Sequence, residues 1–97
     1  MEPFNIKIKY HSNEITLTIL PAENNIFKII YFGGILGAVQ LDHEEWYFRP
    51  IEEIEAGSLP YYTPGKEGSH IEIELTEFVV EQIGAEISEY LETREVR

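Results

Sequence analysis

Residues 26–41 read IFKIIYFGGILGAVQL, two apolar runs separated by Gly33 and Gly34. Apolar residues occupy both phases of the first run, as in a strand that is covered on both faces or that presents one face to a partner. A pair of glycines is a strong hairpin signal, because glycine takes positive φ at both turn positions. The stretch therefore predicts a β-hairpin.

Alternating residues on either side of this hairpin extend it into a sheet. Residues 4–10 and 14–20 alternate apolar and polar side chains, and Ser12-Asn13 between them favours a turn. A polar turn at 42–45 then leads to a short aromatic run. The predicted strands are 4–10, 14–20, 26–32, 35–41, 46–49 and 70–75. Five or six strands joined by short turns predict an antiparallel meander.

The C-terminal residues 77–93 have the periodicity of an amphipathic helix. Its apolar side chains fall within an arc of about 120° on a helical wheel; they are Val79, Val80, Ile83, Ile87, Tyr90 and Leu91. Thr76 stands where a helix N-cap belongs, and Gly84 at the edge of the arc would allow a close approach to the sheet. The predicted fold is α+β, a meander curved around one helix.

Composition limits the class of protein and its partners. The chain has 97 residues, no cysteine and a net charge of −11, which predicts one domain over residues 1–97 without disulfides. The whole acidic excess lies in residues 42–97 and would repel phosphate backbones, so direct nucleic-acid binding and anionic membrane surfaces are not expected. The sequence shows neither a signal peptide nor an apolar run of spanning length, which predicts a cytoplasmic location.

Residue types that carry chemistry are present but do not form a catalytic pattern. The three histidines His11, His43 and His70 lack metal-ligand spacing, and no cofactor motif is found. Carboxylates such as Glu72, Glu74, Glu77 and Glu81 are expected on polar faces in contact with water. The sequence therefore predicts no enzyme activity, no metal and no cofactor.

Two features are candidates for binding. Tyr61 and Tyr62 lie between Pro60 and Pro64 in a long loop at 57–69, where they either contact a partner or cover the core. The second candidate is the doubly apolar strand, with one phase formed by Phe27, Ile29 and Tyr31. This strand is either central in the core or part of a subunit interface.

These features favour a non-enzymatic protein-interaction module whose partner is another protein or a second copy of the chain. One alternative is an acidic mimic of nucleic acid that inhibits a basic partner, with the carboxylates of residues 72–81 as its signature. Another alternative is a small-ligand domain with a pocket between the sheet and the helix. Salt dependence of binding separates the first two hypotheses, since an ionic interface weakens with salt and an apolar one barely changes.

Overall fold

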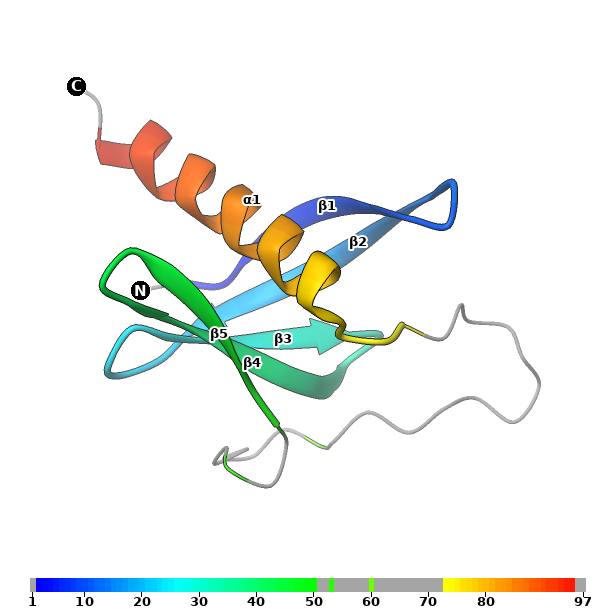
Figure 1. The fold of residues 1–97 in the computed structure, drawn as a ribbon, viewed down its shortest axis with the longest axis horizontal. Helices are drawn as coiled ribbons and strands as arrows, with labels where there is room; N and C mark the ends of the chain where they lie inside the picture. The colour runs from blue at the N-terminus through cyan, green and yellow to red at the C-terminus, as the bar shows by residue number, and fades with distance from the viewer. Residues whose placement is uncertain (1, 51–52, 54–59, 61–72, 96–97) are drawn as a thin grey trace.

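Five strands form one antiparallel sheet in sequence order, and the C-terminal helix packs on its concave face (Figure 1). The structure, a computed structural model, describes residues 2–50, 53, 60 and 73–95. The elements are β1 (Phe4–Tyr10), β2 (Asn13–Pro21), β3 (Ile26–Tyr31), β4 (Gly34–Asp42), β5 (Glu45–Arg49) and α1 (Glu77–Glu95). The predicted α+β meander with one helix is confirmed.

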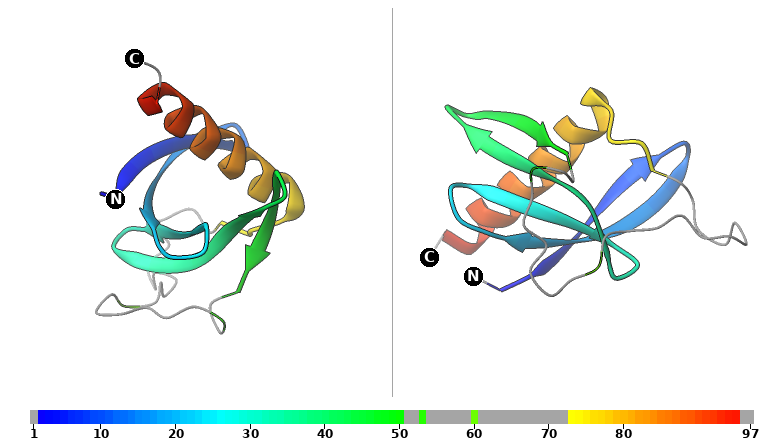
Figure 2. Two further views of the ribbon diagram at one scale, coloured as in Figure 1. Left: turned by 90° about the vertical axis from the view of Figure 1, so that its left-hand side faces the viewer. Right: turned by 90° about the horizontal axis from the view of Figure 1, so that it is seen from below.

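The sheet curls into a half-barrel whose open side is closed by the helix (Figure 2). β1 and β5 are the two edge strands of the described sheet, and α1 contacts both of them. A single helix therefore meets the sheet along two seams, one at each edge.

The core lies between the concave face of the sheet and α1. The alternation of β1 and β2 buries every second side chain, as the sequence predicts. Ile83 and Ile87 of the helix are fully buried against Leu17, Ile19 and Ile29 of the sheet. No polar or charged side chain of the described residues is buried. The predicted pocket between sheet and helix is occupied, in this part of the chain, by packed apolar side chains.

The hairpin turns differ from the sequence prediction by one residue. Tyr31 pairs with Gly34, so the turn positions are Phe32 and Gly33, with φ of 49° and 82°, and not Gly33 and Gly34. In the first hairpin, the turn is likewise His11-Ser12 and not Ser12-Asn13. A one-residue slip would turn the core side chains of a strand outward, so burial fixes the register and forces non-glycine residues into positive φ.

The helix begins as predicted. Val79 N–H donates to the Oγ1 of Thr76 at 3.4 Å, and Val80 N–H donates to the Thr76 carbonyl at 2.8 Å, which makes Thr76 the N-cap. A Cβ at Gly84 would overlap the indole ring of Trp46. Glycine at this position therefore permits the close approach of α1 to β5.

The segment before the helix departs from the predicted sixth strand. Residues 73–76 are irregular, and residues 70–72 lie outside the described part of the chain. Glu74 N–H donates to the Tyr10 hydroxyl at 2.9 Å, while Ile73 and Leu75 pack against the core. The alternating apolar residues Ile73 and Leu75 therefore pack on the core, and the described residues 73–76 do not pair with a strand.

Candidate functional site

The predicted binding strand is a core strand. Phe27, Ile29 and Tyr31 are 7%, 0% and 3% exposed and belong to the core that faces the helix. Their side chains are therefore covered by the chain itself. The other predicted binding residues, Tyr61 and Tyr62, lie outside the described residues.

The outer phase of β3 is only half-exposed. Ile26, Lys28 and Ile30 have intermediate burial, and Ile35 and Ala38 on the neighbouring strand are fully buried on the same convex face. The convex side of β3 is therefore not a broad exposed apolar stripe. Self-association through this strand remains a prediction.

The seam between β1 and α1 is held by a side-chain amide. Lys9 N–H donates to Gln82 Oε1 at 2.6 Å, and Gln82 Nε2 donates to the Lys9 carbonyl at 3.0 Å. The Gln82 amide thus supplies the donor and acceptor that the peptide group of a neighbouring strand would supply. Since Lys9 offers both of its backbone groups to Gln82, these groups point away from β2.

The backbone groups of the other odd-numbered residues of β1 point in the same direction as those of Lys9. In an antiparallel ladder, residues two positions apart direct their backbone groups to the same side. Asn5 and Lys7 therefore present their N–H and C=O groups at the free edge, and no partner for them occurs among the described residues. A hollow of about 430 Å³ lies here, lined by Asn5, Ile6, Lys7, Glu86, Glu89, Tyr90 and Thr93.

The walls of this hollow carry opposite charges. Glu86 and Glu89 lie on the helix side, and Lys7 lies on the strand side. The ring of Phe4 stacks on that of Tyr90 with centroids 3.8 Å apart, which fixes the helix beside the strand. The arrangement provides backbone hydrogen-bonding groups next to carboxylates, and this can hold an extended peptide.

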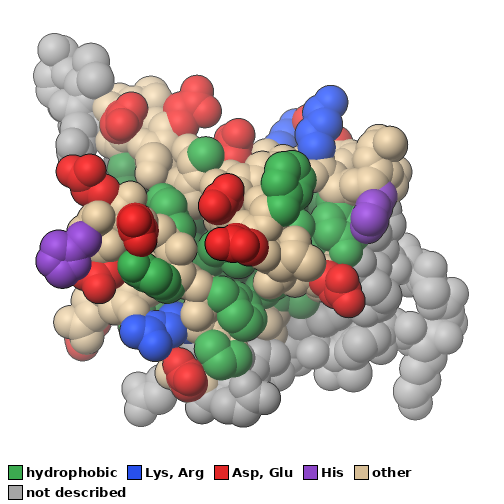
Figure 3. Space-filling model, viewed as in Figure 1, with side chains coloured by type: hydrophobic (Ala, Val, Ile, Leu, Met, Phe, Trp, Pro, Cys, Tyr) green, Lys and Arg blue, Asp and Glu red, His purple; other side chains and the backbone are tan. Residues whose placement is uncertain are grey.

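The exposed side of the helix is acidic, whereas the convex face of the sheet carries charges of both signs. The exposed side of α1 carries Glu77, Glu81, Glu89 and Glu92, and acidic side chains predominate on the face seen in Figure 3. The convex face of the sheet carries the cations Lys7, Lys9, Lys28 and Arg49 together with the carboxylates of Glu14, Glu23 and Glu53. As predicted, Glu74, Glu77 and Glu81 face water, whereas Glu72 lies outside the described residues.

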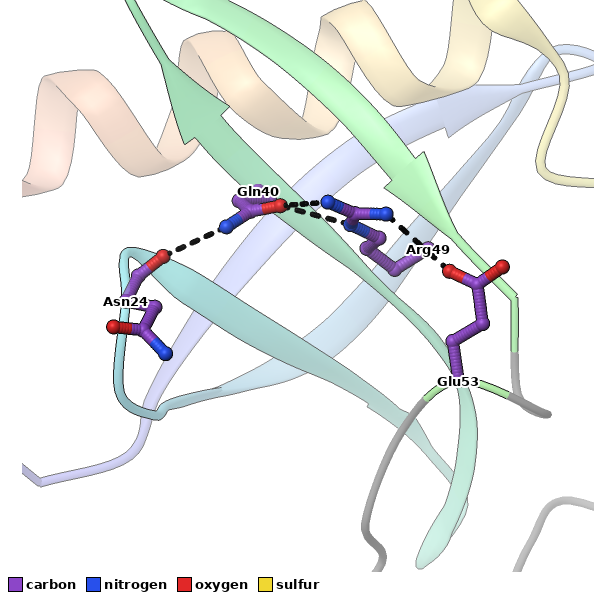
Figure 4. Close-up of polar contacts among 4 residues, drawn as sticks. All are labelled: Asn24, Gln40, Arg49 and Glu53. Atoms are coloured by element: carbon purple, nitrogen blue, oxygen red, sulfur yellow. Dashed lines mark hydrogen bonds and ion pairs between the residues drawn. The ribbon is translucent and has the colours of Figure 1, made fainter.

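A second hollow, of about 530 Å³, lies on the convex face. A chain of polar contacts crosses it (Figure 4). Gln40 Nε2 donates to the Asn24 carbonyl at 3.0 Å, and Arg49 Nε and Nη2 donate to Gln40 Oε1 at 2.8 and 2.5 Å. Arg49 Nη1 contacts Glu53 Oε1 at 3.3 Å. The guanidinium is thereby fixed between two strands and the segment that follows them.

The β4–β5 turn is an exposed polar turn, as expected. His43 Nδ1 lies 2.8 Å from Asp42 Oδ1, and both side chains are solvent-exposed. Tyr47 donates a hydrogen bond to Glu45 at 2.8 Å, and this bond and the carboxylate charge raise the pKa of Tyr47 above 10.0. No cluster of three metal-ligating side chains occurs in the part of the chain that the structure describes.

The chain has no match among protein-family models, curated proteins or solved structures. Among the described residues, no helix has the length and apolar character needed to cross a membrane. The function of the chain is therefore inferred from its own geometry.

Sequence reasoning missed the seam at β1. Lys7 and Lys9 in a strand are a recognised sign of an edge, since lysine discourages edge-to-edge pairing. Gln82 was a further sign, as an uncharged polar residue between the acidic face and the apolar arc of the helix. Which edge of the sheet stays open, however, depends on where the helix docks.

Proposed function

We propose that this chain is a non-enzymatic protein-binding module that takes up a short extended segment of another protein along the free edge of β1. The observation that supports it is the Gln82–Lys9 amide pair, continued by the outward backbone groups of Asn5 and Lys7. Addition of a strand to an exposed edge is a common mode of peptide recognition.

The charges at the seam favour a basic segment as the occupant. Glu86 and Glu89 line the helix side of the hollow, so a lysine or arginine of the partner finds a carboxylate there. A second copy of this chain is the less favoured occupant. Antiparallel pairing of two β1 edges would bring two acidic helices together in molecules that each carry a net charge of −11.

The energetics predict a modest affinity. Two residues with outward backbone groups offer up to four hydrogen bonds, and each contributes about 1 kcal/mol net. Association costs at least about 4 kcal/mol of translational and rotational free energy, so the backbone bonds alone do not hold a peptide. The contacts with Glu86, Glu89 and Tyr90 must supply the remaining binding energy.

The test is peptide binding measured by amide chemical shifts. The probe is the capped peptide Thr-Val-Thr-Lys-Thr-Val-Thr, with N-methyl groups on the residues that face away from β1 to prevent its self-association. Its matched control carries glutamate in place of the lysine. We expect shifts at Asn5 and Lys7, and about tenfold weaker binding of the glutamate peptide, because the change replaces attraction to Glu86 and Glu89 by repulsion and a tenfold change corresponds to about 1.4 kcal/mol.

Two variants of Lys7 distinguish the contribution of its backbone N–H to peptide binding from that of its side-chain charge. Lys7→Pro removes the outward N–H without touching the ladder to β2, and proline is tolerated at such edge positions. Lys7→Ala removes the charge and keeps the N–H. Binding should fall at least tenfold in Lys7→Pro and change little in Lys7→Ala, with both variants melting close to the parent.

Equal binding by Lys7→Pro and Lys7→Ala would overturn strand addition at this edge. Dimerisation of the free chain that is lost in Lys7→Pro but kept in Lys7→Ala would instead identify a second copy as the occupant and overturn the basic partner. Sedimentation analysis of the three proteins distinguishes these results.

A further inference from the structure

We propose that the hollow on the convex face binds a small zwitterion, such as a free α-amino acid, with its carboxylate between Lys28 and Arg49 and its ammonium group at Glu23. This inference is independent of the proposed strand addition, because the two hollows have no lining residue in common. The hollow is lined by residues of the β2–β3 turn and of strands β3, β4 and β5, together with Glu53.

The sheet register places the two cations on either side of a small residue. Lys28 of β3 pairs with Ala38 of β4, and Ala38 pairs with Arg49 of β5. Neighbouring strands lie about 4.8 Å apart, and paired residues direct their side chains to the same face. Because Ala38 has only a methyl group, no large side chain separates Lys28 from Arg49, and both can contact one carboxylate in the hollow that they line.

Arg49 is positioned before any ligand arrives. Gln40 Oε1 accepts hydrogen bonds from Nε and Nη2, and Gln40 is itself held by the Asn24 carbonyl (Figure 4). A guanidinium has five N–H groups, and the contacts to Gln40 and Glu53 use three of them. Two N–H groups remain for an oxyanion, and the fixed geometry reduces the entropy lost on binding.

Lys28 has no such contact. Its side chain has intermediate burial, and it forms no hydrogen bond or ion pair with another described residue. Lys28 and Arg49 line the same hollow, and two cations at one site favour an anionic group between them.

The surroundings select a zwitterion over a simple anion. Glu23 and Glu53 line the same hollow, and the whole chain carries a net charge of −11. Such a field repels a free anion, whereas a neutral zwitterion experiences little net repulsion and can place its ammonium group at a carboxylate. Ile26 supplies an apolar wall, and the hollow of about 530 Å³ is within the range of small-molecule sites.

The experiment compares three probes of similar shape by amide chemical shifts. Leucine carries both charges, 4-methylpentanoate carries only the carboxylate, and 3-methylbutylamine carries only the ammonium group. We expect leucine to give saturable shifts at Lys28, Gln40 and Arg49 and to bind at least tenfold more tightly than either analogue.

Charge-removing variants assign the two ends of the ligand. Lys28→Gln should weaken leucine binding at least tenfold, whereas Lys9→Gln, which removes a cation elsewhere on the convex face, should leave it unchanged. Glu23→Gln should weaken leucine binding and strengthen 4-methylpentanoate binding, a reciprocal effect that a general loss of structure would not produce.

Three results would overturn the proposal. The first is the absence of saturable shifts at about 10 mM leucine, a concentration at which a millimolar site is mostly filled. The second is equal binding of leucine and 4-methylpentanoate. The third is equal loss of leucine binding in Lys28→Gln and Lys9→Gln.

Discussion

The two seams between the helix and the sheet are closed in different ways. At the β5 seam, the indole of Trp46 lies directly over Gly84 and also meets the ring of Phe27 edge-on, with centroids 5.5 Å apart. At the β1 seam, the contacts are the Phe4–Tyr90 stack and the paired hydrogen bonds between Gln82 and Lys9, and a hollow remains beside them.

This difference shows how one helix can both complete a core and leave a sheet edge accessible. A large ring against a glycine fills the β5 seam, because the absence of a Cβ allows the two surfaces to touch. An edge strand also has backbone groups that need hydrogen-bonding partners, and one glutamine satisfies those of a single residue. The β1 seam therefore stays polar and partly open.

The largest expected effect on stability comes from a core substitution that disrupts the packing of the helix at both seams. Ile83→Asp places a carboxylate where the helix side chain is fully buried, and it should destabilise the fold by more than about 4 kcal/mol out of a total of 5–15 kcal/mol. Ala85→Asp, on the exposed side of the helix, is the control and should cost far less. Thermal and urea unfolding provide the measurement, and a melting temperature of Ile83→Asp near that of the parent would contradict this packing.

A smaller effect is expected when only the β5 seam is opened. Gly84→Ala should destabilise the protein by about 1–3 kcal/mol through overlap with Trp46, although alanine is the better helix former. The matched change Ala85→Gly, one residue away on the exposed side, should cost about 1 kcal/mol from helix propensity alone. Fluorescence of the single tryptophan should change in Gly84→Ala and not in Ala85→Gly. A stabilised Gly84→Ala would show that the ring can move aside.

At the β1 seam the expected effect on stability is smaller still. Gln82→Ala removes two hydrogen bonds to Lys9 and should cost about 1 kcal/mol, with faster hydrogen exchange of the Lys9 amide. Glu81→Ala, on the exposed face beside it, should leave that exchange rate unchanged. Because Gln82→Ala lengthens the open edge, the lysine peptide should bind it more tightly than it binds the parent. An unchanged hydrogen-exchange rate of the Lys9 amide in Gln82→Ala would contradict the role of Gln82 in closing this seam.

The smallest effect concerns Tyr47, which lies on β5 but points away from the seam. Its raised pKa means that the folded chain favours the neutral phenol, so this contribution to stability is present below pH 10 and is lost as pH rises through the raised value. Carbon-detected NMR titration should assign a pKa above the ordinary tyrosine value to Tyr47, and this signal should be absent in Tyr47→Phe. In Glu45→Gln, that value should fall, and an unchanged titration would contradict the assigned cause.

Several elements could be predicted from the sequence because each depends on local pattern. The alternation of 4–10 and 14–20 identifies strands with one buried face, and Thr76 before a period-3.6 apolar arc identifies the start of the helix. The close approach at Gly84 was also expected, although the identity of its partner Trp46 was not. The turns at Phe32-Gly33 and His11-Ser12 were predicted one residue late, because turn propensity is weaker than the burial that fixes the register.

The sequence by itself determined the five strands of the meander, the helix and the acidic excess, since periodicity and composition depend on residues close together in the chain or on their sum. It also predicted a sixth strand at 70–75, and the described residues 73–76 are irregular. Only the tertiary structure decided that Phe27, Ile29 and Tyr31 are enclosed in the core, and that Asn5 and Lys7 lie at an open edge beside Glu86. It likewise placed Lys28 and Arg49 on either side of Ala38. The physical reason is that burial and edge exposure depend on which distant segment packs against a strand, and many packings are compatible with the same local pattern.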